Sequence, residues 1–362
     1  MTMSEPANTL DFNLHPVYHG QLGWTSLLQE IDNLKADQLF VIADSHTLSY
    51  CYPLIKSQLS LTPRAVFEIP PGEASKSLET CESIWQALHR YKASRKSLII
   101  NIGGGVVTDI GGFCASVYKR GIPYVNIPTS LLGMVDASIG GKTGIDHQHL
   151  KNVIGSFYPP VAVWIDRSFL STLPLRECVN GYAELIKHAL IADVSLWEEI
   201  NNHDISHLHK DLSQDLLLRA AQIKCQIVDK DPKESGVRKT LNFGHTIGHA
   251  IESLALQNNM DVLHGEAVAM GMEVEAWISH RVVGLSLESY RAIRHFLRST
   301  FPYIKLDREL LPLAMDLMYH DKKNINQKVS FSLLPEIGNA HYDVWIEDED
   351  IITEALWVYI ND

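Results

Sequence analysis

The sequence predicts an α/β protein of two domains, in which a largely parallel, doubly wound sheet is followed by a mostly helical half. Three observations carry this prediction. The chain has 362 residues, more than one ordinary domain needs. Short apolar runs alternate with helical patterns through the first half, as in βαβ units. After about Thr172, helical patterns follow one another with few strand-like runs between them, so we expect the domains to be residues 1–171 and 172–362.

The first half contains four short apolar runs that are expected to be buried strands, because each is rich in branched residues and ends at a turn or cap residue. These runs are Gln38–Ala43, Ala65–Ile69, Ser97–Ile102 and Tyr124–Ile127. The first run ends at Asp44 and Ser45, which suit a helix cap. Thr80–Tyr91 carries apolar residues at helical spacing, so a helix is expected between the second and third strands.

The second half contains five segments whose apolar residues recur at helical spacing. These segments are Glu184–Ala192, Leu212–Asp229, Thr246–Leu256, Glu266–Val282 and Leu287–Arg298. A strand-like run returns at Lys328–Leu334. We therefore expect a mostly α-helical C-terminal domain.

Composition and charge argue against several classes of protein. Apolar residues make up 46% of the chain, which is enough to build two cores. The net charge of −12 argues against a nucleic acid or an anionic membrane as a partner, although a local basic pocket is compatible with it. The five cysteines are scattered and form no C-x-x-C pair, so buried thiols are expected rather than disulfides or a zinc cluster. Because the N-terminus has no signal-peptide pattern and no apolar run has membrane-spanning length, we expect a cytoplasmic protein.

A glycine-rich turn follows the third expected strand. Gly103, Gly104 and Gly105 would let a phosphate approach the backbone, and the helix expected after them would offer its N-terminal N–H groups. The G-x-G-x-x-G pattern is incomplete because Thr108 stands where the third glycine belongs, so a cofactor site and a simple tight turn both stay open. Asp44 could hold a cofactor ribose hydroxyl, with a helix N-cap as the alternative.

Histidines and a glutamate in the second half have the chemistry of metal ligands. His245 and His249 are four residues apart, so they share one face of the expected helix, and His264 begins another helix. Glu184 lies in an apolar helix, where a charged residue is usually paired or coordinated. Three protein ligands with one open position make a catalytic site of the zinc type. The alternative is that the histidines are hydrogen-bonded core residues, and the pattern does not decide which of them bind metal.

Basic residues gather in short motifs beside glycine or inside apolar segments. They are Lys119, Arg120, Lys142, Lys151, Lys187, Lys224, Arg238, Lys239, Lys322 and Lys323. A pocket that binds both a phosphate and a carboxylate needs such an excess of donors. For any single lysine, surface solubility is the alternative.

Taken together and in order, these segments resemble the 3-dehydroquinate synthase family of sugar-phosphate cyclases. The matching stretches are Pro71–Lys76, Gly103–Gly112, Ile127–Leu131, Val135–Gly144, Lys151–Asn152, Gly181–Lys187, Arg238–His249, His264–Glu266 and His320–Lys323. The resemblance implies an N-terminal Rossmann-like domain that binds NAD, a helical C-terminal domain that binds metal and substrate, and a site in the cleft between them. It implies that Glu184, His245 and His264 bind the metal. His249 would then contact the substrate in proton transfer.

The resemblance also implies the remaining site residues. Those for NAD are Asp44, Glu73, Lys76, Gly104, Gly105, Val106, Asp109, Thr129, Ser130, Lys142, Lys151 and Thr172. Those for the substrate are Asp136, Lys142, Asn152, Lys187, Lys224, Arg238, Asn242, His249 and either Lys322 or Lys323. Arg120 would reach the substrate phosphate from the partner subunit of a homodimer.

The implied activity is that of a carbon–oxygen lyase dependent on NAD and one divalent metal, zinc or cobalt. It converts 3-deoxy-D-arabino-heptulosonate 7-phosphate to 3-dehydroquinate and phosphate, in the shikimate pathway to aromatic amino acids. Relatives that make valiolone- or gadusol-type cyclitols tend to lose the Gly140–Gly144 run and to alter the Arg238 and Asn242 pair, and both features are intact here. The alternatives are another sugar-phosphate cyclase, a metal-dependent polyol dehydrogenase and a non-catalytic binding protein.

Overall fold

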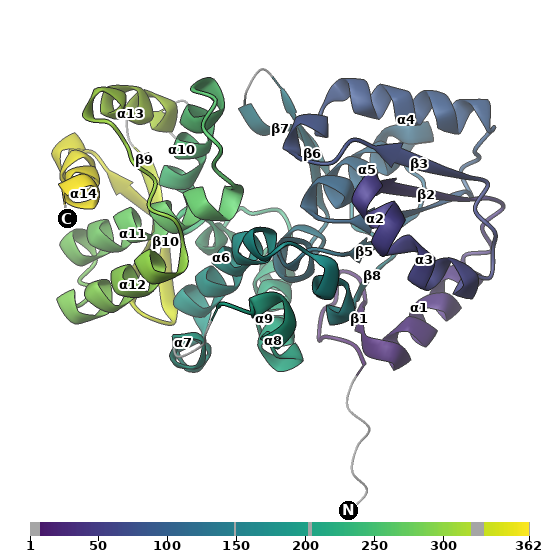
Figure 1. The fold of residues 1–362 in the computed structure, drawn as a ribbon, viewed down its shortest axis with the longest axis horizontal. Helices are drawn as coiled ribbons and strands as arrows, with labels where there is room; N and C mark the ends of the chain where they lie inside the picture. Colours follow the sequence, from purple (N-terminus) through teal and green to yellow (C-terminus); the bar gives the residue numbers. More distant parts are fainter. Residues whose placement is uncertain (1–7, 148–149, 202–204, 320–328, 362) are drawn as a thin grey trace, which may run out of the picture. The chain divides into compact units, whose positions relative to one another are not determined.

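A computed structural model of the chain describes residues 8–147, 150–201, 205–319 and 329–361 (Figure 1). The chain divides into two compact units. The first is Met1–Cys178 with His209–Pro232, and the second is Val179–Leu208 with Lys233–Asp362. The first unit therefore includes a segment from late in the sequence. The functional division expected at residues 171 and 172 stays a prediction.

Six parallel strands form the sheet of the first unit, in the order β1-β8-β5-β4-β2-β3. They are β1 (Val17–His19), β2 (Leu39–Asp44), β3 (Ala65–Ile69), β4 (Leu98–Gly103), β5 (Tyr124–Pro128) and β8 (Ala162–Ile165). The parallel sheet and the four expected strands, β2 to β5, are confirmed. The central strands β4 and β5 are buried along their whole length, as strands covered on both faces are.

The helices of the first unit are α1 (Gly20–Asn33), α2 (Ser45–Tyr50), α3 (Tyr52–Ile55), α4 (Leu78–Arg90), α5 (Gly105–Val117), α8 (Leu208–Asp211) and α9 (Gln214–Lys230). Of these, α1, α2, α4 and α5 pack against this sheet or its neighbours. The helix expected over Thr80–Tyr91 is confirmed as α4, whose Ile84 and Leu88 pack in one core with Ile99 of β4. Trp24 of α1 packs on Trp164 of β8, with ring centroids 4.5 Å apart.

Two smaller elements of the first unit carry predicted site residues. An antiparallel hairpin is formed by β6 (Lys142–His147) and β7 (Leu150–Phe157). A turn of π-helix spans Gly133–Ala137, between β5 and the hairpin. Neither element was expected from the sequence, because a π turn and a short glycine-containing hairpin have no periodicity to detect.

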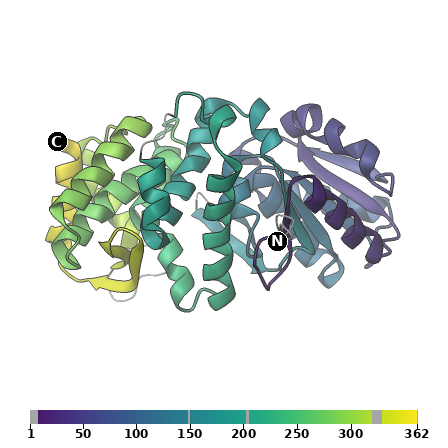
Figure 2. The same cartoon turned by 90° about the horizontal axis from the view of Figure 1, so that it is seen from below.

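The second unit is mostly helical, as expected. Its elements are most of α6 (Leu175–Ala192), α7 (Val194–Ile200), α10 (His245–Gln257), α11 (His264–Val282), α12 (Leu287–Thr300), α13 (Leu311–Tyr319), β9 (Val329–Glu336), β10 (Asn339–Ile346) and α14 (Glu349–Asn361). Its helices lie side by side in Figure 2 (green to yellow). Helix α11 is buried on all sides from Gly265 to Ala276, and its Met270 and Val274 share one core with Ile251 of α10 and Phe331 of β9.

All five cysteines are free and buried, so the expectation of buried thiols is confirmed. Within the described ranges, no helix combines the length and the apolar character needed to cross a bilayer.

Candidate active site

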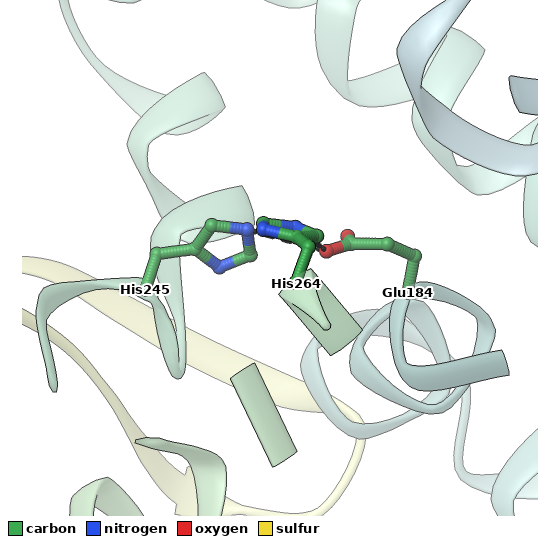
Figure 3. Close-up of side chains that lie close together, drawn as sticks. All are labelled: Glu184, His245 and His264. Atoms are coloured by element: carbon green, nitrogen blue, oxygen red, sulfur yellow. Dashed lines mark hydrogen bonds and ion pairs between the residues drawn. The ribbon is translucent and has the colours of Figure 1, made fainter. Parts of the chain in front are cut away.

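Glu184, His245 and His264 come together from three helices of the second unit (Figure 3). Glu184 lies in the middle of α6, whereas His245 and His264 are the first residues of α10 and α11. The Nε2 atom of His245 lies 3.2 Å from Oε1 of Glu184, and the Nε2 atom of His264 lies 3.3 Å from the same oxygen. One ligand atom from each residue lies within 4.8 Å of the others. This donor set, two imidazoles and a carboxylate, suits one divalent cation.

The second ring nitrogen of each histidine is held by a hydrogen-bond acceptor. His245 Nδ1 lies 3.1 Å from the carbonyl oxygen of Phe243, and His264 Nδ1 lies 3.1 Å from Oε2 of Glu252. An acceptor at Nδ1 places the proton there and leaves the Nε2 lone pair available. Both rings therefore present Nε2 as a ligand atom towards Glu184, so the residues fit a metal ion.

The start of α10 is fixed by a buried side chain. Glu275 accepts hydrogen bonds from the backbone N–H groups of Gly244 (2.7 Å) and Ile247 (3.1 Å), so this buried carboxylate caps α10. Gly244 has φ of 80°, in the left-handed region, and a Cβ there would lie 2.5 Å from Met272 Cγ. The glycine therefore allows α10 to begin against α11 with His245 at its first position.

Electrostatics favour a charged Glu184. The side chain is fully buried, and burial alone would raise its pKa. The ammonium of Lys187, which is ion-paired with the other carboxylate oxygen, and the imidazole of His245 together hold the pKa of Glu184 well below its usual range. Burial lowers the pKa of His245 and favours its neutral, ligating form. For His264 burial acts in the same direction, but Glu252 and Glu184 outweigh it and raise its pKa to about 10. Without a metal this ring therefore carries a second proton on Nε2, which a bound cation would displace. Glu184 is thus a paired charge, as its apolar helix predicted.

His249 is near this group without belonging to it. Its ring centroid is 5.2 Å from that of His245 and 6.3 Å from that of His264. Among the described residues, the group that could hold a metal in this unit pairs His245 with His264. The four-residue spacing did not distinguish His245 from His249 as a metal ligand. In the structure, His245 belongs to the candidate ligand group and His249 does not. The role of His249 in proton transfer stays a prediction.

Arg238 and Asn242 lie in a 3-10 turn, Val237–Asn242, that leads directly into α10. The Arg238 side chain is buried, with an exposed fraction of 1%. Asn242 Nδ2 donates to Oε1 of Glu234 at 2.9 Å. Both residues thus lie in the turn that directly precedes the helix of His245. Their contact with a substrate stays a prediction.

Asp136 and Lys224 form a pair within the first unit. Lys224 Nζ of α9 lies 2.6 Å from Oδ1 of Asp136 in the π turn. Lys224 is buried. Lys142 begins β6 and is exposed, and the two residues before it, Gly140 and Gly141, have φ of 94° and 68°. The structure therefore joins Asp136 to Lys224, and it places Lys142 six residues after Asp136 in the same segment.

The glycine turn meets the following strand at the carboxyl edge of the sheet. Gly103 ends β4, Gly104 is the N-cap of α5, and a Cβ on Gly104 would lie 2.9 Å from Ser130 Oγ. Thr129 N donates to Gly103 O at 3.0 Å, so the two predicted NAD segments lie against each other. The carboxyl ends of parallel strands are where dinucleotides bind, with the pyrophosphate on a helix N-terminus. The turn fits such a group, and Val106 follows in the first turn of α5.

Asp44 serves as the helix cap that was the alternative to a ribose contact. Its Oδ1 accepts from the Thr47 backbone N–H at 2.8 Å, and Thr47 Oγ1 accepts from the Asp44 N–H at 3.0 Å, which together make a capping box. The cap is confirmed, and the contact with a cofactor stays a prediction.

Lys76 is the centre of a charged network that joins residues predicted for NAD and substrate. Its Nζ lies 2.7 Å from Asp109 Oδ2 and 2.6 Å from Asn152 Oδ1. Lys151 Nζ lies 2.7 Å from Glu73 Oε1. Although burial acts against it, Asp109 and Glu73 raise the pKa of Lys76, so the ammonium stays charged. Residues far apart in sequence thus form one connected cluster.

The remaining predicted residues end 3-10 turns or lie outside the described chain. Arg120 is exposed, with φ of 67°, at the end of the 3-10 turn Tyr118–Arg120. Thr172 is exposed at the end of another 3-10 turn and donates to Phe169 O at 3.3 Å. Lys322 and its alternative Lys323 lie outside the described residues.

The supporting residues were not expected from the sequence. They are Glu234, Glu252 and Glu275 in the second unit, and Asp146, whose Oδ1 accepts from Asn152 N at 2.8 Å. Glu252 gave a usable signal, because it is a charged residue in an apolar helix, as Glu184 is. Asp146 gave none, because it lies in a polar segment.

Solved structures of other proteins share this fold. A 2-epi-5-epi-valiolone synthase from Streptomyces hygroscopicus subsp. jinggangensis, solved with NAD+ and Zn2+ bound, is 28% identical, with a TM-score of 0.81 over 99% of this chain and 98% of that one. A probable glycerol dehydrogenase from Sinorhizobium meliloti is 15% identical, with a TM-score of 0.66 over 95% and 96% of the two chains. The second likeness shows the fold alone.

Family models and curated relatives agree with each other. Models of the N-terminal and C-terminal parts of 3-dehydroquinate synthase match residues 66–180 and 181–324. The 3-dehydroquinate synthase of Parabacteroides distasonis is 39% identical over 91% of this chain and 93% of its own length. That of Methylacidiphilum infernorum is 41% identical over the same shares. The resemblance carried by the sequence motifs is thus confirmed over nearly the whole chain, which belongs to the 3-dehydroquinate synthase family.

Proposed function

We propose that this protein catalyses the conversion of 3-deoxy-D-arabino-heptulosonate 7-phosphate to 3-dehydroquinate and inorganic phosphate, with NAD and one zinc or cobalt ion as cofactors. The observation that carries the proposal is the convergence of Glu184, His245 and His264, with both Nε2 atoms within 3.3 Å of one carboxylate oxygen. In a chain of this family, three such ligands suit a site that leaves coordination positions for a substrate.

The residues of the second unit prepare the reacting end of the substrate. A divalent cation, when bound, supplies Lewis acidity that lowers the pKa of the substrate hydroxyl to be oxidised. Phe243 O and Glu252 hold the two histidine rings, and Lys187 keeps Glu184 ionised. His249, beside His245, moves protons to and from the substrate.

Anion-binding residues hold the ends of the substrate. Arg238 grips its carboxylate with two parallel hydrogen bonds, and Asn242 adds a neutral one. The hydroxyls and the phosphate of the substrate are bound by Lys142, Asn152, Lys224 and either Lys322 or Lys323. Asp136 orients Lys224 through their ion pair. Fixed geometry matters because the intermediates are reactive and must not leave the site.

The glycine turn of the first unit binds NAD. The backbone at Gly104, Gly105 and Val106 would accommodate the pyrophosphate of a bound NAD, and Asp44 would hold a ribose. Thr129, Ser130 and Thr172 would contact the rest of the cofactor. The cofactor would also contact the charged network described above, which consists of Lys76, Glu73, Asp109 and Lys151. NAD supplies reversible hydride acceptance, so the oxidation is undone before the product leaves and the net reaction is redox-neutral.

A limiting-NAD assay tests the proposed reaction. The purified, metal-loaded protein receives a trace of NAD and an excess of heptulosonate phosphate, and inorganic phosphate is followed against NADH absorbance. Phosphate should rise far beyond the amount of NAD while NADH stays flat. A polyol dehydrogenase would stop once its NAD was reduced, so NADH accumulation without phosphate contradicts the proposal. Faster phosphate release from a heptulose phosphate that lacks the carboxylate would favour another sugar-phosphate cyclase.

Arg120 belongs to a neighbouring subunit in this proposal, which describes a cytoplasmic homodimer. An Arg120→Ala variant and a His264→Ala variant should each be inactive alone. After they are mixed and allowed to exchange subunits, activity should return, because one of the two sites in each mixed dimer is complete. A mixture that stays inactive while subunit exchange is demonstrated would place Arg120 in the site of its own chain.

A further inference from the structure

The segment Asn8–Pro16, here called the N-terminal strap, is bound to α9 in the first unit. Asp11 N donates to Gln222 Oε1 at 2.9 Å, and Gln222 Nε2 donates back to Asp11 O at 2.7 Å. Asn13 donates to the carboxylate of Asp229 from its backbone N–H (3.0 Å) and from Nδ2 (2.9 Å). Main-chain and side-chain bonds at two points seven residues apart on α9 attach the strap along one side of the helix.

The strap then contributes a buried histidine to the segment that follows the π turn. His15 has an exposed fraction of 4%, and its Nε2 accepts a hydrogen bond from the Gly140 N–H at 3.3 Å. Its Nδ1 lies 3.3 Å from Pro16 O, and its ring packs edge-on against Phe12, with centroids 4.7 Å apart. The two contacts fix one neutral tautomer, with the proton on Nδ1 and the Nε2 lone pair directed at Gly140.

The contacts of the strap hold two segments that carry predicted substrate residues, helix α9 and the segment Asp136–Lys142. Gly140 lies between Asp136 and Lys142, and α9 carries Lys224, whose Nζ is 2.6 Å from Asp136. At 100° per residue, Lys224 points away from the side of α9 that carries Gln222. The strap therefore binds the side of α9 opposite Lys224. Its histidine binds the segment that contains Asp136, the partner of Lys224. Asn126 Nδ2 adds a second buried bond to this segment, 3.2 Å from Ser138 O.

We propose that His15 is a positioning residue for the segment Asp136–Lys142, and that the N-terminal strap thereby sets the geometry of Asp136, Lys142 and Lys224 in the substrate site. The inference rests on the proposed function for its catalytic consequence but not for its structural part. His15 acts through the Gly140 backbone, because Gly140 has no side chain through which the segment could be held. The next residue, Gly141, is held separately, since its carbonyl oxygen accepts from Tyr158 N at 2.8 Å.

Two substitutions of His15 separate its hydrogen bond from its bulk. His15→Phe keeps a ring against Phe12 and removes the acceptor, whereas His15→Gln offers an amide oxygen near the position of Nε2. His89→Phe, on the exposed face of α4, is the matched control. Hydrogen exchange is measured on the peptide that covers residues 138–143, and phosphate release is measured in parallel.

In His15→Phe, the Gly140 amide should exchange about 10-fold faster, and kcat/KM for the heptulosonate phosphate should fall about 10-fold. Metal content should not change, and His15→Gln should recover most of both losses. Unchanged exchange in His15→Phe overturns the proposal, and so does faster exchange with unchanged kinetics. If the unmodified protein releases no phosphate while His15→Phe still exchanges faster, the proposed function fails and the positioning stands.

Asn13→Asp provides the same test without touching the core. It places a carboxylate against that of Asp229 and should detach the strap by like-charge repulsion. Exchange over residues 138–143 should then rise in a folded protein. If His15→Phe does not fold and Asn13→Asp leaves this exchange unchanged, the strap has no positioning role.

Discussion

Glu252 should control metal affinity without touching the metal. Its carboxylate is buried, with an exposed fraction of 5%, and its Oε2 lies 3.1 Å from His264 Nδ1. This contact fixes the ring orientation of His264 and makes Nε2 a better electron donor. Glu252→Ala removes the acceptor, whereas Glu252→Gln keeps an oxygen in place and removes only the charge.

The size of the effect follows from these two differences. Loss of a partner to a ligating histidine typically weakens metal binding 10- to 100-fold, or about 1.4 to 2.7 kcal/mol. Glu252→Ala should lie near the upper value, about 100-fold, because His264 also loses its orientation. Glu252→Gln should lie near about 10-fold, because a neutral acceptor remains.

Competition of the metal-free protein with a chelating indicator for Zn2+ measures these constants without any substrate. His249→Ala is the control and should change the dissociation constant less than about 3-fold, whereas His264→Ala should lose most of the affinity. Unchanged zinc affinity in Glu252→Ala refutes the supporting role. Loss of the ion from His249→Ala, with retention by His264→Ala, refutes the ligand assignment itself.

Three further predictions concern other residues. Arg238→Lys should lower turnover at least about 10-fold and leave NAD affinity intact, because an ammonium cannot bind a carboxylate at two points; normal steady-state kinetics would reopen the neutral-sugar cyclases. Lys224→Met should raise the substrate KM about 10-fold with unchanged metal content, since Asp136 loses its cation; an unchanged KM contradicts this. Burial lowers the pKa of His15 from 6.5 to about 4, so the stability gained by keeping it neutral is complete above pH 6.5 and is lost as the pH falls towards 4, about 3 kcal/mol in all. His15→Gln should remove this part of the acid sensitivity in urea titrations, and parallel pH profiles of the two proteins would contradict it.

The strands that the sequence predicted are those whose apolar runs are long enough to recognise. β2 and β4 have six residues each and are buried, whereas β1 and β8 have three and four. Such short runs carry no period, and β1 becomes a strand because Val17 pairs with Val163 of β8, which is distant in the sequence. Tertiary pairing thus decides what local pattern cannot.

The metal ligands were predicted as a set of candidates, and the resemblance to a family was needed to choose among them. Helical spacing treats His245 and His249 alike, because it reports the face and not the depth along the helix. The structure distinguishes them, since His245 starts α10 and faces Glu184. Glu252 and Glu275 act through contacts that close only when α10 and α11 pack together, so their roles could not be derived from the sequence.

During synthesis from the N-terminus, the first unit cannot finish folding until α9 has been made. Asp11 and Asn13 bind residues of α9 that lie 211 and 216 residues further along the chain, and α9 belongs to the same unit as they do. A ribosome must therefore release the whole parallel sheet, and part of the second unit, before the first unit can be completed. Until then the surface that α9 covers stays open to chaperones and proteases. A fragment ending at Cys178 should consequently remain unstable and aggregate, however complete its sheet is.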